Sequence, residues 1–282
     1  MTTFKIILAY DGAGFVGWQR QASGASIQGL LEDALRALDE RDVPVTGAGR
    51  TDAGVHALGQ VASFSLARAM APDVLVRAMN ARLPDTIRVL AATEAPAAFH
   101  ARFDARKKTY RYRIWNGDVM SPFERAQAWH VSGALDVEQM AEAARLLEGR
   151  HDFAAFQSAG GGAATTEREV FSSCISLDDG GPDGSHDGSR RAGLPPSREA
   201  SADRRSLGGG GEACRACLIV YEITGNGFLR HMVRTIVGTL VEIGRGRQSA
   251  AWMRDVVASR DRARAGPTAP AAGLFLAGVQ YD

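Results

Sequence analysis

The stretch Gly47-Ala48-Gly49-Arg50-Thr51-Asp52-Ala53-Gly54-Val55-His56 leads into an apolar run at residues 61–66. Glycine tolerates positive φ angles and close approach of other atoms, so this stretch predicts a tight loop. The polar side chains that we expect it to present are those of Arg50, Thr51, Asp52 and His56. A neighbouring arginine favours an ionised Asp52, and an accessible carboxylate is a candidate nucleophile. A surface turn with an incidental ion pair has the same pattern, and the loop alone leaves both interpretations open.

The composition describes an ordinary globular protein. The chain has 282 residues, of which 45% are hydrophobic and 23% charged, enough for one large or two medium domains. A net charge of +1 gives no overall signal for nucleic acid, although local basic patches remain possible. The N-terminus does not resemble a signal peptide, and no apolar run approaches the ~20 residues of a membrane span, so we expect a cytoplasmic protein.

The cysteines predict neither a disulfide framework nor a metal site. There are three, and Cys214 and Cys217 form a C-x-x-C pair. A zinc site needs a second such pair or a paired histidine motif, which the sequence lacks, so we expect reduced structural thiols.

Hydrophobic periodicity outlines an α+β chain. Strands are predicted at residues 4–10, 61–66, 87–93, 109–115, 167–177, 216–224 and 274–281. Helices are predicted after the N-cap Ser26, from Pro72, after the capping box Asp136/Gln139 with Gly149 as its stop, at 228–243, and near 250–258.

This order is typical of two similar halves, not of a parallel doubly wound sheet. We expect residues 1–104 and 105–282 to form mixed or antiparallel sheets that join, with a cleft between them. Residues 178–213 are rich in Gly, Ser, Asp, Arg and Pro, which predicts a disordered insertion within a hairpin.

A basic segment precedes and enters the predicted strand at 109–115. Its cations, opposed only by Asp104, are Arg102, Arg106, Lys107, Lys108, Arg111 and Arg113. Alternation puts Tyr110, Tyr112 and Ile114 on one face of the strand. Cations with interleaved aromatics suit RNA, where phosphates are neutralised and bases stack, but charges on an edge strand that deter aggregation look the same.

The helix predicted at 228–243 carries a broad apolar stripe. Arg230, His231 and Arg234 lie off the stripe, and Arg234 lies beside its edge. A cation in that position either places its head in a neighbouring cleft or extends to solvent.

Five motifs, in order along nearly the whole chain, resemble the tRNA pseudouridine synthase A (TruA) family. They are Tyr10-Asp11-Gly12 with Gly17-Trp18-Gln19-Arg20-Gln21; Gly49-Arg50-Thr51-Asp52-Ala53-Gly54-Val55-His56-Ala57-Leu58-Gly59-Gln60-Val61; Lys107-Lys108-Thr109-Tyr110-Arg111-Tyr112; Phe228-Leu229-Arg230-His231-Met232-Val233-Arg234 with Ile236-Val237-Gly238; and Ala269-Pro270-Ala271-Ala272-Gly273-Leu274-Phe275-Leu276.

The resemblance implies the pseudouridine synthase fold, a central sheet with helices on one side and the active site between two halves. It also implies isomerisation of uridine to pseudouridine at nucleotides 38 to 40 of the tRNA anticodon stem-loop, without cofactor or metal. A homodimer with one tRNA across both subunits would be the active form. The alternatives are a non-catalytic RNA-binding or RNA-folding protein with the same fold, and a carboxylate hydrolase with a second acid.

The resemblance also implies roles for individual residues. Asp52 would attack ribose C1′ or uracil C6 of a flipped uridine, with Arg234 as its partner and Tyr110 stacked on the uracil. Leu274 or Leu276 would form an apolar wall, and Arg50 would fill the vacated stack or hold a phosphate. The phosphate contacts would come from Arg20, Arg102, Arg106, Lys107, Lys108 and Arg230. The other expected substrate contacts are Gln19, Thr51, His56 and His231.

Overall fold

The computed structural model describes residues 1–160, 164–178 and 216–281. The predicted insertion at 178–213 lies outside these residues except for Asp178, the last residue of a strand. Within the described part of the chain, no helix is long and apolar enough to cross a membrane.

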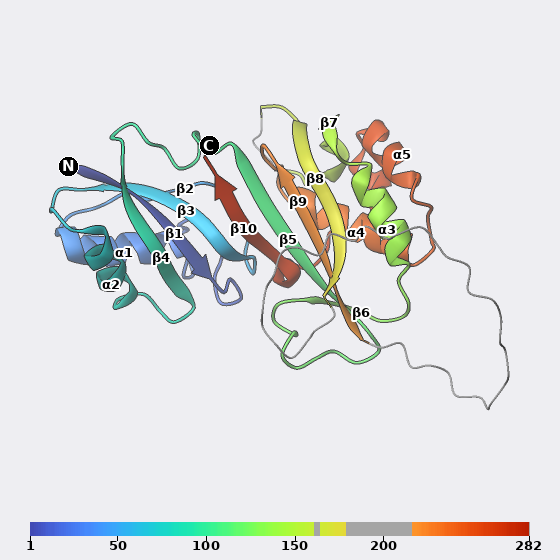
Figure 1. Ribbon diagram of the computed structural model, residues 1–282, viewed down its shortest axis with the longest axis horizontal. Helices are drawn as coiled ribbons and strands as arrows, with labels where there is room; N and C mark the ends of the chain where they lie inside the picture. The colour runs from blue at the N-terminus through green and yellow to red at the C-terminus, as the bar shows by residue number, and fades with distance from the viewer. Residues whose placement is uncertain (161–163, 179–215, 282) are drawn as a thin grey trace, which may run out of the picture.

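One mixed sheet runs through the whole molecule (Figure 1). Its main order is β4-β1-β3-β10-β5-β9-β8-β7, with β2 beside β3 and β6 beside β5. The strands are β1 Thr2–Tyr10, β2 Thr46–Gly47, β3 His56–Leu66, β4 Ile87–Ala95, β5 Lys107–Asn116, β6 Trp129–Val131, β7 Gly149–Asp152, β8 Glu167–Asp178, β9 Cys217–Gly225 and β10 Leu274–Gln280. The predicted α+β class and joined sheet are confirmed.

Residues 1–104, called here the first half, carry two helices, α1 Ile27–Asp39 and α2 Pro72–Asn80. The predicted N-cap of α1 is present, because the Ser26 hydroxyl accepts a hydrogen bond from the Gly29 backbone N–H at 3.2 Å. Pro72 occupies the first turn of α2, where its missing N–H costs nothing.

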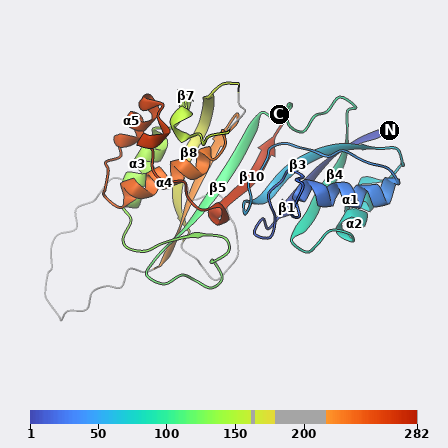
Figure 2. The same cartoon turned by 180° about the vertical axis from the view of Figure 1, so that it is seen from behind.

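The second half carries α3 Val137–Arg145, α4 Met232–Gly244 and α5 Trp252–Ser259. The Asp136 side chain caps α3 by accepting from Gln139 N–H at 2.9 Å, as predicted. The predicted stop at Gly149 is wrong: α3 ends at Arg145, and Gly149 begins β7 with a φ of +99°. In the rear view of Figure 2, α1 and α4 lie in front of the strands, so helices of both halves cover the same face.

The last strand, β10, joins the two halves. It pairs parallel to β3 through Phe275 with His56 and Leu276 with Ala57, and antiparallel to β5 from Leu274 to Gln280. The loop that follows β2 and the start of α4 are therefore held near one another.

Strand β5 shows the predicted alternation. Tyr110, Tyr112 and Ile114 are buried, whereas Arg111 and Arg113 lie on the other face. The edge-strand interpretation is wrong, because β5 pairs with β10 on one side and β9 on the other. Arg111 is paired with Glu222 at 3.0 Å and Arg113 with Glu124 at 2.8 Å, so the unpaired cations of this strand are at its start.

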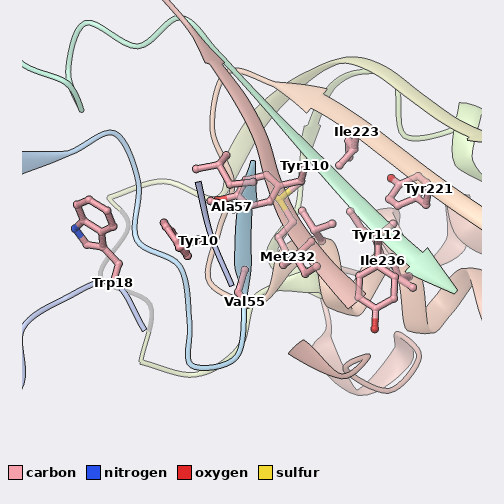
Figure 3. Close-up of a cluster of buried hydrophobic side chains, with 14 of the residues drawn as sticks. Tyr10, Trp18, Val55, Ala57, Tyr110, Tyr112, Tyr221, Ile223, Met232 and Ile236 are labelled. Carbon is pink, nitrogen blue, oxygen red and sulfur yellow. The ribbon is translucent and has the colours of Figure 1, made fainter. Parts of the chain in front are cut away.

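One large apolar cluster extends across the junction of the halves (Figure 3). In the close-up, Tyr10 and Trp18 come from the first half, and Tyr110 and Met232 from the second. The Tyr10 and Trp18 rings lie 6.4 Å apart. This continuous packing fixes the first half relative to the second more firmly than a flexible linker would.

Candidate active site

The loop between β2 and β3 is a tight turn held by its neighbours. Val55 N–H donates to the Asp52 carbonyl at 3.1 Å, and Gly54 has a φ of +77°, which only glycine adopts readily. Trp18 N–H donates to the Thr51 carbonyl at 3.0 Å. Gly17 allows this contact, since a Cβ there would lie 2.7 Å from that carbonyl oxygen.

A buried polar network supports the loop from below. The Tyr10 hydroxyl and Thr51 Oγ1 are 2.8 Å apart, and the Gln60 amide donates to the Gly49 carbonyl at 3.0 Å. Burial raises the pKa of Tyr10 to about 12, partly offset by its hydrogen bonds to Thr51 and Gln60, so Tyr10 stays neutral. Sequence reasoning placed neither Tyr10 nor Gln60 in the site, although both belong to motifs that carried the resemblance.

The expectation that the loop presents four polar side chains is wrong for two of them. Arg50 is exposed and Asp52 is 40% exposed, but Thr51 and His56 are only 6% and 1% exposed. The His56 ring stacks on Phe275 at 4.6 Å, and Asp11 lies 3.0 Å from its Nδ1. Burial lowers the His56 pKa despite the nearby Asp11 carboxylate.

Asp52 meets two side chains from the other half. His231 Nε2 lies 3.3 Å and Arg234 Nη1 lies 3.9 Å from the same carboxylate oxygen, Oδ2. Arg234 is fixed by a 2.7 Å hydrogen bond from its Nε to the Ala269 carbonyl, and Ala269 N–H returns a bond to the Arg234 carbonyl at 3.1 Å. The Arg234 guanidinium thus points toward Asp52 and does not extend to solvent, which decides between the two orientations that the sequence left open.

His231 is closer to Asp52 than Arg234 is, which the sequence did not suggest. The helix predicted from residue 228 begins only at Met232, and His231 precedes it with a left-handed φ of 62°. Because His231 is not helical, a helical wheel that starts at residue 228 does not give the direction of its imidazole. His231 Nδ1 is 2.8 Å from the Ser158 hydroxyl, a residue that no sequence motif indicated.

Tyr110 lies beside these groups on β5. It is 8% exposed, and its ring meets Phe228 edge to face at 5.0 Å. Burial raises its pKa strongly, with further upward contributions from Tyr10 and the Asp52 charge, so the hydroxyl stays protonated. A Cβ at Gly49 would lie 4.0 Å from the Tyr110 hydroxyl and 3.8 Å from Lys108 Nζ, which places both beside the loop.

The two leucines expected as an apolar wall are at the start of β10. Leu274 is 6% exposed and Leu276 is fully buried, and they pair with Tyr112 and Tyr110 of β5. They therefore belong to the packed junction of the halves that supports the site.

The remaining expected contacts lie in different environments. Gln19, Arg102, Arg106 and Arg230 are exposed. Arg20 is paired with Glu32 at 3.0 Å and Asp33 at 3.2 Å, so its charge is largely matched. Lys107 Nζ lies 5.1 Å from the Phe171 ring centre. Lys108 Nζ donates to the Ala48 carbonyl at 2.7 Å, and burial lowers its pKa to about 8, with help from the charges of Arg102 and Arg168.

The arrangement suits attack by a carboxylate on a carbon electrophile. Asp52 is accessible on one side and approached by a guanidinium and an imidazole on the other, with a neutral phenol nearby. Among residues 1–160, 164–178 and 216–281, no three His, Cys, Asp or Glu side chains gather as metal ligands would.

Comparison with known proteins assigns the family. A family profile described as tRNA pseudouridine synthase matches residues 6–104 and 143–282. The tRNA pseudouridine synthase A of Methylacidiphilum infernorum is 41% identical over 278 residues, covering 99% of this chain and 95% of the relative. Those of Myxococcus xanthus and Geobacter sulfurreducens are 40% and 41% identical over 281 residues, covering all of this chain and 92% and 100% of the relatives. The chain belongs to the tRNA pseudouridine synthase family, whose members are isomerases.

Proposed function

We propose that this tRNA uridine isomerase acts on nucleotides 38 to 40 of the anticodon stem-loop, with Asp52 as the covalent nucleophile. The observation that supports this most directly is the meeting of Asp52, from one half of the chain, with His231 and Arg234 from the other, at 3.3 Å and 3.9 Å. We further propose that residues 1–104 supply the nucleophile and residues 105–282 its partners.

The reaction exchanges one bond to ribose C1′ for another. A paired uridine is out of reach, so it must leave the helix, at a cost of a few kcal/mol. Asp52 forms a covalent bond to ribose C1′ or uracil C6, and the C1′–N1 bond breaks. The uracil turns, a C1′–C5 bond forms, the C5 proton is lost to solvent, N1 takes up a proton, and Asp52 is released. No electrons leave the substrate, so the sequence needs no oxidant.

Three side chains shape the pocket for the detached base. Tyr110 offers a neutral ring for stacking, and Leu274 and Leu276, packed in the junction behind it, keep water from entering on that side. Thr51 and His56, which are buried, act by holding the loop in place.

Cations near the site bind the RNA backbone. Arg50 projects from the loop, where it fills the vacated stack or holds a phosphate. Further phosphate contacts come from Arg102, Arg106, Lys107, Lys108 and Arg230, and weaker ones from Arg20, whose charge is matched by acids. Gln19 and His231 are the remaining polar groups on this surface. Affinity for tRNA should therefore fall steeply with salt.

The oligomeric state and the cellular compartment complete the proposed function. The active form is a homodimer with one tRNA lying across both subunits, and the enzyme works in the cytoplasm without cofactor or metal. Sedimentation of the protein with and without tRNA measures the stoichiometry, and two chains for one tRNA is the expected result.

Release of tritium from tRNA labelled at uridine C5 tests the reaction itself. The wild-type protein should release label and form pseudouridine, and Asp52→Asn should abolish both, since an amide is not a nucleophile here. Asp85→Asn is the matched control, because Asp85 is fully exposed and paired only with Arg88. Its rate should equal that of the wild type.

The alternatives give other results. A non-catalytic RNA-binding protein would bind tRNA and release no label in either form. A carboxylate hydrolase would liberate free uracil and leave an abasic ribose. Pseudouridine formation by Asp52→Asn at the wild-type rate would refute the assignment of the nucleophile.

A further inference from the structure

His231 is the nearer of the two basic side chains that face the Asp52 carboxylate, and its imidazole has a second polar contact on its other side. Its Nε2 lies 3.3 Å from Asp52 Oδ2, and its Nδ1 lies 2.8 Å from the Ser158 hydroxyl. Ser158 is fixed in turn, because its backbone N–H donates to the Arg230 carbonyl at 3.2 Å. The three side chains form a chain that runs from a loop near residue 158 to the nucleophile.

The charge state of Asp52 determines how the protons are arranged in this chain. A proton is favoured on the ring nitrogen that faces Asp52, since an unprotonated nitrogen would point its lone pair at the negative carboxylate 3.3 Å away. Nδ1 of a neutral imidazole is then an acceptor, and the Ser158 hydroxyl is the donor to it. Burial, together with Arg234, Arg230 and Arg262, lowers the His231 pKa, and the Asp52 charge opposes this shift, which keeps the ring neutral near pH 7.

The backbone at His231 is shaped for this position. Its φ of 62° is left-handed, a state that histidine and asparagine adopt more readily than most other residues. His231 also precedes α4 without capping it through its side chain. In this conformation the imidazole meets both Asp52 and Ser158.

Arg234 cannot take over this role from its place in the structure. Its nearest nitrogen is 3.9 Å from Asp52, outside hydrogen-bond distance, and its Nε is committed to the Ala269 carbonyl. Arg234 supplies charge from a greater distance, and the imidazole is the nearer of the two basic groups.

We infer that His231, oriented by Ser158, is a positioning residue that contacts Oδ2 of Asp52 and so holds the carboxylate for attack on the substrate. The inference rests on the proposed function of Asp52. It assigns His231 to the nucleophile instead of to the RNA, which was the expectation from the sequence.

Two substitutions separate the ring nitrogens. The amide of His231→Gln reaches about as far as Nε2 and keeps a donor for Asp52, whereas His231→Asn ends near Nδ1 and keeps only the contact with Ser158. Single-turnover pseudouridine formation should fall about tenfold or more in His231→Asn, because a slightly misplaced nucleophile already loses rate, and stay within about threefold of wild type in His231→Gln. Ser158→Ala should lie between them.

Affinity for tRNA and pH dependence provide the other readouts. The dissociation constant for tRNA should stay within about twofold in all three variants. The wild-type rate should fall at acid pH, because a protonated imidazole pairs more strongly with the Asp52 carboxylate and makes it a weaker nucleophile. His231→Gln should lack this acid limb of the pH–rate profile. His151→Gln on β7 is the histidine control and should match the wild type throughout. Thermal unfolding verifies that each variant is folded, and Ser158→Ala decides the question if His231→Asn is not.

Three results would overturn the inference: a wild-type rate in His231→Asn, equal losses in the Asn and Gln variants, or weaker tRNA binding with an unchanged rate. An NMR measurement that needs no catalysis distinguishes a failure of this inference from a failure of the proposed function. The imidazole pKa of His231, followed by NMR, should fall in Asp52→Asn because the opposing carboxylate charge is gone. An unchanged pKa would refute the contact, whereas an inactive wild type would refute only the reaction.

Discussion

At the scale of single residues, Lys108 shows how the fold alters a side chain whose type alone suggests only phosphate binding. Its Nζ is largely buried beside the Asp52 loop, bonded to the Ala48 carbonyl at 2.7 Å and near the charges of Arg102 and Arg168. No carboxylate compensates, so its pKa drops to about 8. The charged form of Lys108 is therefore less favourable in the folded protein than in the unfolded chain.

This predicts a specific dependence of stability on pH. Below pH 8 Lys108 is charged in both states and its desolvation lowers the free energy of unfolding. Between about 8 and 10.5 the folded state loses the proton first, so stability rises with pH, by up to about 3 kcal/mol in total. Urea unfolding of wild type and Lys108→Met at pH 7, 8, 9 and 10 measures it. The wild-type value should rise relative to that of the variant, and a constant or falling difference would contradict the explanation.

Sequence motifs identified some residues of the candidate site but not the contacts between them. Asp52, Arg234 and Tyr110 were identified from motifs, and the structure brings them together. His231 was noticed, but its closeness to Asp52 depends on a left-handed φ that no local pattern encodes. Ser158 is 73 residues from His231 and reaches it only through tertiary folding.

At the scale of elements, local signals predicted what is local. The Ser26 and Asp136 caps, Pro72, and the alternation in β5 all appear as predicted, because each depends on a few neighbouring residues. The pairing of β10 between β3 and β5 was not predictable, since strand partners are chosen by packing across the whole chain. The start of α4 was misplaced because an apolar stripe does not mark where helical dihedral angles begin.

The caps of α1 and α2 give a paired prediction on stability. Ser26→Ala removes the side-chain acceptor for Gly29 N–H and should cost about 1 kcal/mol. Ala71, at the same position of α2, is exposed, extended and without a cap bond, so Ala71→Ser should gain about 0.5–1 kcal/mol. Chemical denaturation compares the two. Shifts of the same sign in both variants would show that capping does not limit these helices.

At the scale of the whole molecule, the active site depends on the seam between β3 and β10. A Cβ at Gly59 would lie 2.8 Å from the Ala277 carbonyl oxygen and 3.3 Å from the Gly278 Cα, both of them backbone atoms. Neither can move aside as a flexible side chain would, so the two strands must separate to admit it. The seam positions Asp52 relative to His231 and Arg234.

Gly59→Ala should therefore reduce pseudouridine formation at least about tenfold, since misplacement by about 1 Å can cost a hundredfold. Gly14→Ala is the control, because a Cβ there meets nothing within 4 Å. Both variants should retain their far-UV circular dichroism, since the core of each half is intact. A fully active Gly59→Ala would mean that the seam tolerates displacement without disturbing the site.

The position of β10 has a consequence for biosynthesis. A ribosome makes the chain from its N-terminus, so β10 leaves the exit tunnel after all nine other strands of the sheet. Until then the nascent polypeptide can fold each half, but the edges of β3 and β5 remain open to one another and to other chains. Asp52 therefore meets His231 and Arg234 in their final arrangement only after β10 has paired with β3 and β5.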